Sequence, residues 1–210
     1  MYRKSKAIAP TYASVTICFL PVIGMYTKCV SNDGEGNTIL TARLPYNAQM
    51  TPVIDLDAAE EGVLVKMETD HIMGGSEPCV RAEYITRKGS QKYESLGWMN
   101  GDELRVIYPE NAGITFNSLG YRETGYNCER EGSFTSSDET INRFWEKAMR
   151  TLYVNMRDTY FDCPDRERAQ WWGDVTILMG QSFYQLSPDV NALTKKAIHE
   201  LVDWQREGGT

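Results

Sequence analysis

The sequence predicts an α+β protein in which an antiparallel β-sandwich precedes a group of helices. From about residue 36 to residue 133 apolar side chains recur at every second position, and turn residues separate these runs. From residue 134 onward the apolar period becomes helical. Strands followed by helices indicate segregated elements, not alternating βαβ units. We therefore expect an N-terminal segment (1–35), a sandwich domain (36–133) and a helical region (134–210).

The N-terminal segment has two interpretations. A basic start followed by a mixed apolar stretch over 13–24 has the outline of a secretory leader, although Thr16 and Pro21 interrupt it and no clear cleavage site follows. Alternatively, Val15, Ile17 and Phe19 alternate with other side chains and predict a first β-strand. A leader would imply a periplasmic or secreted protein and its absence a cytoplasmic one, so the localisation stays open.

Period-two alternation predicts the strands of the sandwich, because it directs one set of side chains to a buried face. The inward sets are Val63, Val65 and Met67; Val80, Ala82 and Tyr84; Leu104, Val106 and Tyr108; and Ile114 and Phe116. Turns are expected between them at Gly74-Gly75, Lys88-Gly89-Ser90, Asn100-Gly101-Asp102 and Asn111-Ala112-Gly113. The Asn100-Gly101 pair is the strongest hairpin signal, since both residues tolerate positive φ.

Three helices are expected after residue 134. Ser136 and Glu139 have the spacing of a capping box, and a helix of four or five turns should follow. A second helix is expected over about 172–186, and a third begins at Ser187-Pro188. The first and third apolar stripes are Ile141, Phe144, Trp145, Ala148, Leu152 and Met156, then Val190, Leu193, Ala197, Leu201 and Trp204.

Composition excludes several classes of protein. The net charge of −7 argues against nucleic-acid and anionic-membrane partners, and no apolar run is long enough to span a bilayer. Five cysteines without a CxxC pair, and only two histidines, do not resemble a zinc site or a disulfide framework. We therefore expect neither a metal nor a cofactor.

The densest polar sequence is DTYFDCPDRERAQWWGD, residues 158–174. Pro164 predicts that it begins as a constrained loop. If a helix resumes by Glu167, then Glu167, Trp171 and Asp174 share one face. Crowded carboxylates beside aromatic rings can keep one acid protonated near neutral pH, as general-acid catalysis requires, and indole rings suit sugars. The competing interpretation is an ion-pair network that holds two helices together.

The string DCPDRERAQWWGD resembles the hallmark of the bacterial α-L-rhamnosidase family of glycoside hydrolases. The matching residues are Asp162, Cys163, Pro164, Arg166, Glu167, Arg168, Trp171, Gly173 and Asp174. The segments 121–126, 132–134 and 144–159 also resemble that family, so the likeness covers about residues 36–210.

This resemblance implies a fold and a set of roles. Family members have β-sandwich domains ahead of a catalytic (α/α)6 barrel and hydrolyse rhamnose-containing glycans or glycosides with inversion. Glu167 would be the general acid, and Asp162 and Asp174 would bind rhamnose hydroxyls. Arg166 would hold the loop or a carboxylate, and Trp171 would form a wall of the sugar pocket.

The resemblance also implies a second carboxylate, the general base, which in the family lies far downstream. The 73 residues from 138 to 210 are too few for the twelve helices of such a barrel, which need on the order of 200 residues. We therefore expect a fragment that carries the opening helices of an incomplete barrel and the acid without the base. Alone it should have little or no hydrolase activity, and exposed apolar helix faces would favour self-association.

Other functions predict different residues. Cys163 could act as a nucleophile with His71 or His199 as its base, although nothing in the sequence brings either histidine near. The chain could instead be a non-catalytic carbohydrate-binding or interaction module. Its stacking surfaces would then be the sandwich aromatics Tyr93, Trp98, Tyr108 and Tyr121, for which core packing is the favoured alternative.

Overall fold

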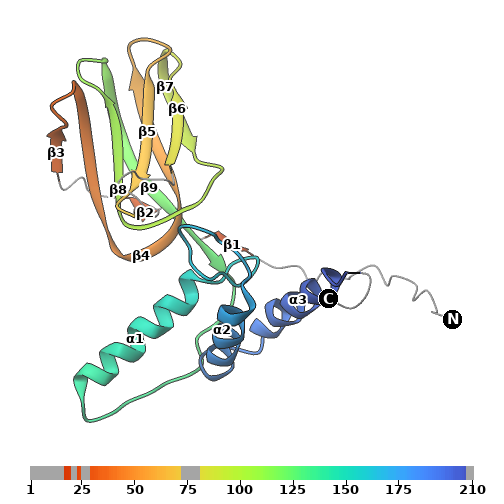
Figure 1. Cartoon of the computed structure of the whole chain (residues 1–210). Coiled ribbons are helices and arrows are strands. Elements are labelled where there is room, and N and C mark those ends of the chain that lie inside the picture. Colours follow the sequence, from red (N-terminus) through yellow and green to blue (C-terminus); the bar gives the residue numbers. More distant parts are fainter. Residues whose placement is uncertain (1–16, 20–22, 25–28, 72–80, 207–210) are drawn as a thin grey trace.

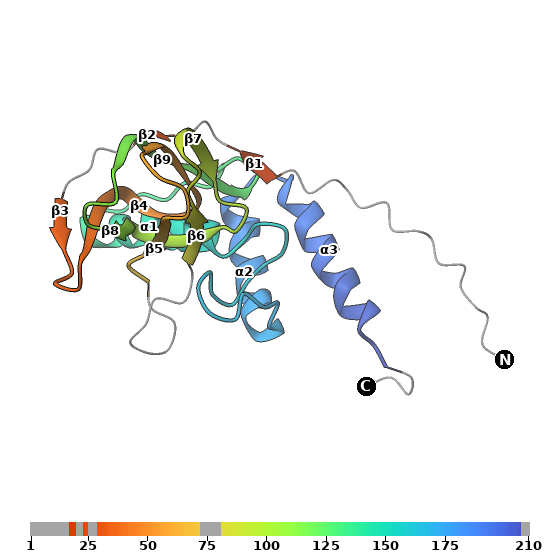
Figure 2. The same ribbon diagram turned by 90° about the horizontal axis from the view of Figure 1, so that it is seen from above.

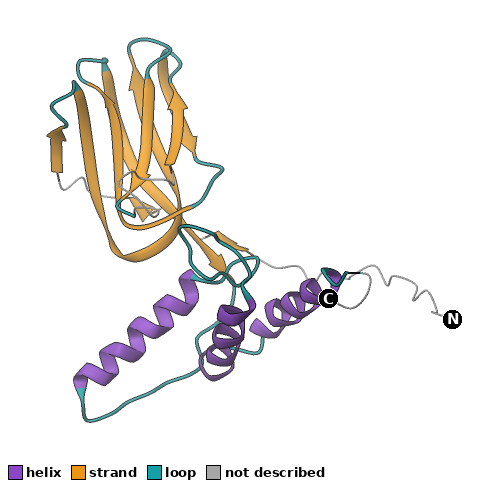
Figure 3. Ribbon diagram, in the orientation of Figure 1, coloured by secondary structure: helices purple, strands orange, loops and turns teal. Residues whose placement is uncertain are grey.

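The computed structural model describes residues 17–19, 23–24, 29–71 and 81–206. In this part of the chain nine antiparallel strands are followed by three helices, so the expected α+β class is confirmed (Figures 1 and 3). The strands are β1 (Ile17–Phe19), β2 (Ile23–Gly24), β3 (Cys29–Asn32), β4 (Asn37–Ala58), β5 (Leu64–Thr69), β6 (Arg81–Ile85), β7 (Gly89–Glu94), β8 (Met99–Pro109) and β9 (Ile114–Tyr126). The helices are α1 (Glu139–Val154), α2 (Trp172–Gln185) and α3 (Val190–Asp203).

The strands form two layers joined by the long strand β4. Its first part, residues 37–43, pairs with β3 and β8, and β8 continues through β5 to β6. Its last part, residues 53–58, pairs with β7 and β9. Figure 2 shows β4, β8, β5 and β6 in one row, and β2, β9 and β7 in the other. The bend of β4 between these parts includes a shift of register between Arg43 and Ala48.

The core between the layers contains the inward side chains that alternation predicts. Val65, Met67, Leu104 and Val106 are fully buried, and Phe116 packs against them with other half-buried rings. Val80 and the expected turn at 74–75 lie outside the described residues. Ile17–Phe19 does form a strand, which pairs with the end of β9.

One expected hairpin turn is wrong, because Asn100 and Gly101 lie inside β8. The expected turn at Asn111-Ala112-Gly113 is confirmed, since it joins β8 to β9 and Asn111 and Gly113 have positive φ. Asn100 is buried and donates a hydrogen bond to Asn47. A Cβ on Gly101 would lie 2.6 Å from the Cβ of Thr69, so this glycine permits two strands to approach closely.

The helices begin and end close to the expected positions, but the capping box is wrong. The N-cap of α1 is Asp138, whose carboxylate accepts from the N–H of Thr140 at 2.8 Å. Ser136 instead accepts from the N–H of Asp138. Only the C-terminal half of the α1 stripe is buried, since Leu152 is 0% exposed and Phe144 71% exposed. None of the described helices has both the length and the apolar character needed to cross a membrane.

A second core joins the helices to the end of β9. Tyr160 is fully buried in this core, and its hydroxyl lies 3.0 Å from Thr194 on α3 and 3.3 Å from Ser182 on α2. The apolar members are Tyr126, Leu152, Met156, Val175, Leu178, Val190, Leu193 and Ala197. The loop between α1 and α2 starts from this core and reaches the edge of the sandwich.

Candidate active site

The segment between α1 and α2 closes into a short loop. The N–H of Asp162 donates to the carbonyl of Ala169 at 3.0 Å, and the N–H of Ala169 donates to Asp162 Oδ1 at 3.0 Å. Residues 163–168 lie between these two bonds, and Arg168 has a left-handed φ of 52°. The constrained loop expected at Pro164 is therefore confirmed.

The expected single helical face is wrong. Helix α2 begins at Trp172, so Glu167, Trp171 and Asp174 do not share one helix. A helix cannot resume at Glu167, because the next residue, Arg168, is left-handed and the Asp162 carboxylate binds the N–H of Ala169.

The loop brings together the expected acid and two of its expected neighbours. Side-chain atoms of Asp162, Cys163 and Glu167 lie within 4.8 Å of one another, and Arg166 forms an ion pair with Glu167. Burial acts to raise the pKa of Asp162, but hydrogen bonds from the Glu167 side chain and from backbone N–H groups outweigh it. The pKa of Asp162 therefore lies below its usual value.

The other two expected site residues lie farther along the chain. Trp171 is 57% exposed, directly before α2, and Asp174 is exposed in the first turn of that helix. A carboxylate at this position interacts favourably with the N-terminal end of the helix dipole. No hydrogen bond or ion pair joins these two side chains to Glu167 among the described residues.

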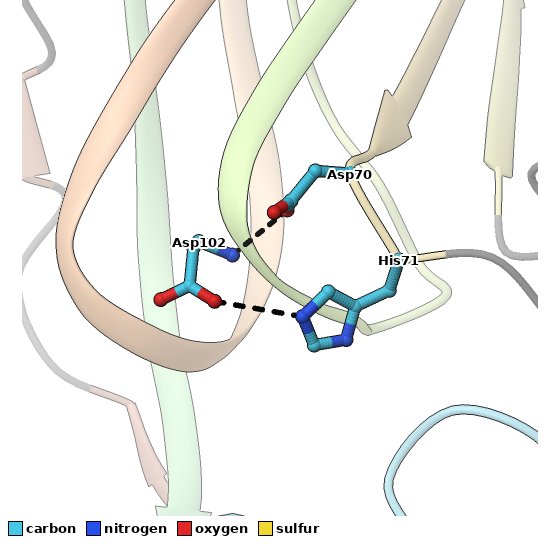
Figure 4. Close-up of side chains that lie close together, drawn as sticks. All are labelled: Asp70, His71 and Asp102. Atoms are coloured by element: carbon cyan, nitrogen blue, oxygen red, sulfur yellow. Dashed lines mark hydrogen bonds and ion pairs between the residues drawn. The ribbon is translucent and has the colours of Figure 1, made fainter.

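The opposite side of the loop is held by the sandwich. His71 Nδ1 lies 2.8 Å from Asp165 Oδ2. The other ring nitrogen, His71 Nε2, lies 3.5 Å from Asp102 Oδ2 (Figure 4). Asp70, the neighbour of His71, accepts hydrogen bonds from the N–H groups of Asp102 and Glu103 at 2.9 and 2.8 Å. No pattern in the sequence places His71 near the motif, because 94 positions separate it from Asp165.

Trp98 is the second contact between the sandwich and the loop. The Arg168 guanidinium lies 3.6 Å from the centre of the Trp98 ring, and its Nη1 donates to the Trp98 carbonyl at 3.2 Å. Phe161 stacks on the same indole at 5.6 Å, and the Arg157 guanidinium lies 5.3 Å from it. The indole therefore packs against the loop.

The other proposed stacking aromatics also pack within the sandwich. Tyr93 stacks on Tyr84 with ring centres 4.5 Å apart, and Tyr108 packs on Phe116 at 5.2 Å. Tyr121 is 1% exposed. These contacts agree with core packing, the alternative that the sequence favoured.

The arrangement does not favour a cysteine nucleophile. The Cys163 side chain forms a hydrogen bond with Asp162, and both His71 ring nitrogens already have partners, Asp165 at Nδ1 and Asn47 at Nε2. The second histidine, His199, is exposed on α3.

Two groups of side chains have the composition of metal ligands. They are Asp162, Cys163 and Glu167 on the loop, and Asp70, His71 and Asp102 at the sandwich edge. Hydrogen bonds within the groups and to the backbone account for both arrangements, so we assign a metal to neither.

Comparison with known proteins agrees with this geometry. Residues 129–210 match the family model described as the bacterial α-L-rhamnosidase 6 hairpin glycosidase domain. A search of curated protein sequences finds no significant match.

Several solved structures have the same fold. A GH78 family rhamnosidase of Bacillus sp. GL1 aligns over 86% of this chain and 18% of its own, with 22% identity and a TM-score of 0.69. The α-L-rhamnosidase from Dictyoglumus thermophilum aligns over 92% of this chain and 22% of its own, with 17% identity and a TM-score of 0.72. The Streptomyces avermitilis α-L-rhamnosidase complexed with L-rhamnose aligns over 91% of this chain and 19% of its own, with 13% identity and a TM-score of 0.70.

The chain thus spans about a fifth of the length of these three proteins. At these identities the likeness establishes the fold, and the match over residues 129–210 supplies the link in sequence. Together they confirm that this chain resembles the bacterial α-L-rhamnosidase family of glycoside hydrolases.

Proposed function

We propose that this chain supplies the general-acid side of an α-L-rhamnosidase site, which removes terminal α-L-rhamnose from glycosides or polysaccharides with inversion. One observation carries the proposal: the loop places the partly exposed Glu167 carboxyl beside Asp162, within the region that matches the rhamnosidase domain. The L-rhamnose in the Streptomyces avermitilis complex supports the choice of sugar. We propose the boundaries 36–133 and 134–210 for the sandwich and the catalytic region.

In this proposal Glu167 protonates the glycosidic oxygen as the bond to rhamnose breaks. Hydrogen bonds, including those from backbone N–H groups, hold the pKa of Asp162 below its usual value, so this carboxylate favours its ionised form beside Glu167. We assign the acid role to Glu167 because it lies in the region that matches the rhamnosidase domain and a general acid must reach the glycosidic oxygen. The side chain of Glu167 is 36% exposed, so a substrate oxygen can reach it.

The surrounding side chains supply the proposed sugar contacts. Asp162 and Asp174 accept hydrogen bonds from rhamnose hydroxyls, and the exposed ring of Trp171 forms an apolar wall. Arg166 forms an ion pair with Glu167 and so holds the acid within the loop.

An inverting site also needs a general base. In inverting enzymes the two carboxyl groups stand roughly 6.5–9.5 Å apart, so that a water molecule fits on the far side of the sugar ring. Asp162 does not meet this requirement, because its oxygen lies within 4.8 Å of Glu167 and the two share a hydrogen bond. We therefore propose that this chain provides the acid without the base and that it has little or no hydrolase activity alone.

Titration of the full chain with L-rhamnose, followed by NMR, tests the proposed site. Asp162→Asn should weaken binding on the order of tenfold, since a charge-assisted hydrogen bond contributes about 1.5–3 kcal/mol. Asp158→Asn is the matched control, because Asp158 is an exposed carboxylate just before the same loop. Equal affinities of the two variants would contradict the assignment of Asp162.

A second assay tests the acid and the missing base. We expect no turnover of an aryl α-L-rhamnoside by the chain alone. Turnover that disappears in Glu167→Gln would confirm the acid and contradict the missing base.

The binding-module alternative predicts saccharide affinity that survives Glu167→Gln and depends on a sandwich tryptophan. The structure changes how this test must be designed. Trp98→Ala would remove the packing surface of Arg168 and Phe161, so it would disturb the loop as well. The two functions are better separated by Asp162→Asn and Trp171→Ala, which leave the sandwich intact.

A further inference from the structure

The β-sandwich holds the loop on both sides of Glu167. Two positions before Glu167, Asp165 Oδ2 lies 2.8 Å from His71 Nδ1, at the end of β5. One position after it, the Arg168 guanidinium covers the Trp98 ring at 3.6 Å. Glu167 itself has its partners, Asp162 and Arg166, on the loop. The loop therefore uses separate residues for attachment and for chemistry.

The backbone at Arg168 indicates that this attachment is specific. A non-glycine residue rarely adopts a left-handed φ such as the 52° at Arg168, and it persists where the surroundings impose it. Here Arg168 Nε donates to the Pro164 carbonyl at 2.8 Å, and Nη1 donates to the Trp98 carbonyl at 3.2 Å. These bonds fix the direction in which the chain leaves Glu167.

We propose that His71 and Trp98 are positioning residues, through which the sandwich sets the place of Glu167 and Asp162 relative to the sugar. Neither residue needs to touch the substrate. The inference rests on the proposed function of Glu167, and it adds that residues of the sandwich position the loop that carries this acid.

The charges around His71 make the attachment depend on pH. The imidazole faces Asp165 on the loop, Asp102 on β8, its own neighbour Asp70 and the amide of Asn47 on β4. The hydrogen bond with Asp165 raises the pKa of His71, and burial opposes this only in part.

The sign of the pH dependence follows from this direction. Folding raises the pKa of His71. The stabilisation from the His71–Asp165 pair is therefore complete below the pKa of His71 in the unfolded chain, about 6.5, and is lost as the pH rises through its pKa in the folded protein. Above that pH, a neutral imidazole can still donate from Nδ1 to the Asp165 carboxylate, but the attraction between opposite charges is lost.

Amide hydrogen exchange of the full chain tests the attachment without any sugar. In His71→Ala the N–H groups of Asp162 and Ala169, which close the loop, should exchange on the order of tenfold faster, because a charge-assisted bond is lost. His199→Ala is the matched control, since this exposed histidine lies on α3. Exchange in α1 should not change, and His71→Asn should restore much of the protection, because its amide can donate to Asp165. Unchanged exchange in His71→Ala would overturn the proposal.

The pH dependence of L-rhamnose affinity provides a readout that a merely structural role would not change. In the wild type the affinity should fall as the pH rises through the titration of His71, and in His71→Asn this dependence should disappear. Trp98→Leu should weaken binding about tenfold at every pH, because it removes the packing of Arg168 without a titrating group. If the wild type does not bind L-rhamnose, the proposed function fails, while hydrogen exchange still decides the positioning role. An identical pH profile of L-rhamnose affinity in the wild type and in His71→Asn would overturn the positioning role of His71.

Discussion

At the scale of single residues, Gly132 connects the end of the sheet to the helices. Its N–H donates to the carbonyl of Gln185 at 3.0 Å, and a Cβ added to it would lie 2.7 Å from the Cα of Gln185, closer than real Cβ contacts. Gly132→Ala should therefore cost about 1–3 kcal/mol of unfolding free energy, because backbone must move. A Cβ added to Gly180, within α2, would have no other atom within 4 Å. Gly180→Ala should therefore stabilise the folded protein by about 0.5–1 kcal/mol. Urea denaturation measures both changes, and equal effects would contradict the packing at Gly132.

The residues that the sequence could not place are those whose partners are distant in the chain. The motif identified Glu167 and Asp162, since their chemistry and spacing are local. His71 and Trp98 reach the same loop across 94 and 70 positions, and no local pattern marks such contacts. The Asn100-Gly101 pair was misassigned for a related reason: Gly101 permits close packing with Thr69, which local turn propensity does not describe.

At the scale of elements, helix α1 is attached to the sandwich by a buried ion pair. Arg150 Nη2 lies 2.7 Å from Oε1 of Glu123, whose side chain is 3% exposed. Tyr46 donates to the other oxygen of Glu123 at 2.9 Å, and its burial together with this bond raises the pKa of Tyr46 to about 12. The carboxylate is therefore satisfied from both elements.

Removal of Arg150 should leave this carboxylate buried without its counter-charge. We expect Arg150→Leu to destabilise the protein by about 3–5 kcal/mol, as the loss of one partner of a buried pair typically does. Arg43→Leu removes a partner of Glu103 from a pair in which Arg43 is 68% exposed, and it should cost less than about 1 kcal/mol. Thermal denaturation compares the two, and similar losses would show that burial of Glu123 is unimportant.

Strand β4 shows which elements sequence patterns miss. The helices and the strands with one exposed face were predicted from their periods. No strand was predicted over Asn37–Ala58, although it is the longest of the described strands. It contains Pro45 and Pro52, and residues 48–54 are all buried because the strand passes between the layers. Over residues 48–54 both faces are buried and no alternation can be detected, whereas the two outer parts of β4 do alternate.

At the scale of the whole molecule, each of the three helices carries large apolar side chains that are exposed. Phe144 is 71% exposed, Ile177 71%, Tyr184 80% and Trp204 84%. Shallow hollows lie beside Phe144 and Trp204, and neither includes the motif loop. Large apolar side chains exposed in this way can mark sites of association. We therefore propose self-association of the chain through its helices.

This association should depend on concentration and on the helix faces specifically. In sedimentation experiments the apparent mass of the chain should rise with concentration, and Phe144→Ser combined with Trp204→Ser should reduce the rise, since each change removes a large apolar contact area. Leu96→Ser is the matched control, because this 97% exposed side chain lies between β7 and β8 of the sandwich and not on a helix. Equal suppression by Leu96→Ser would point to general surface hydrophobicity, whereas a constant monomeric mass at all concentrations would contradict the association itself.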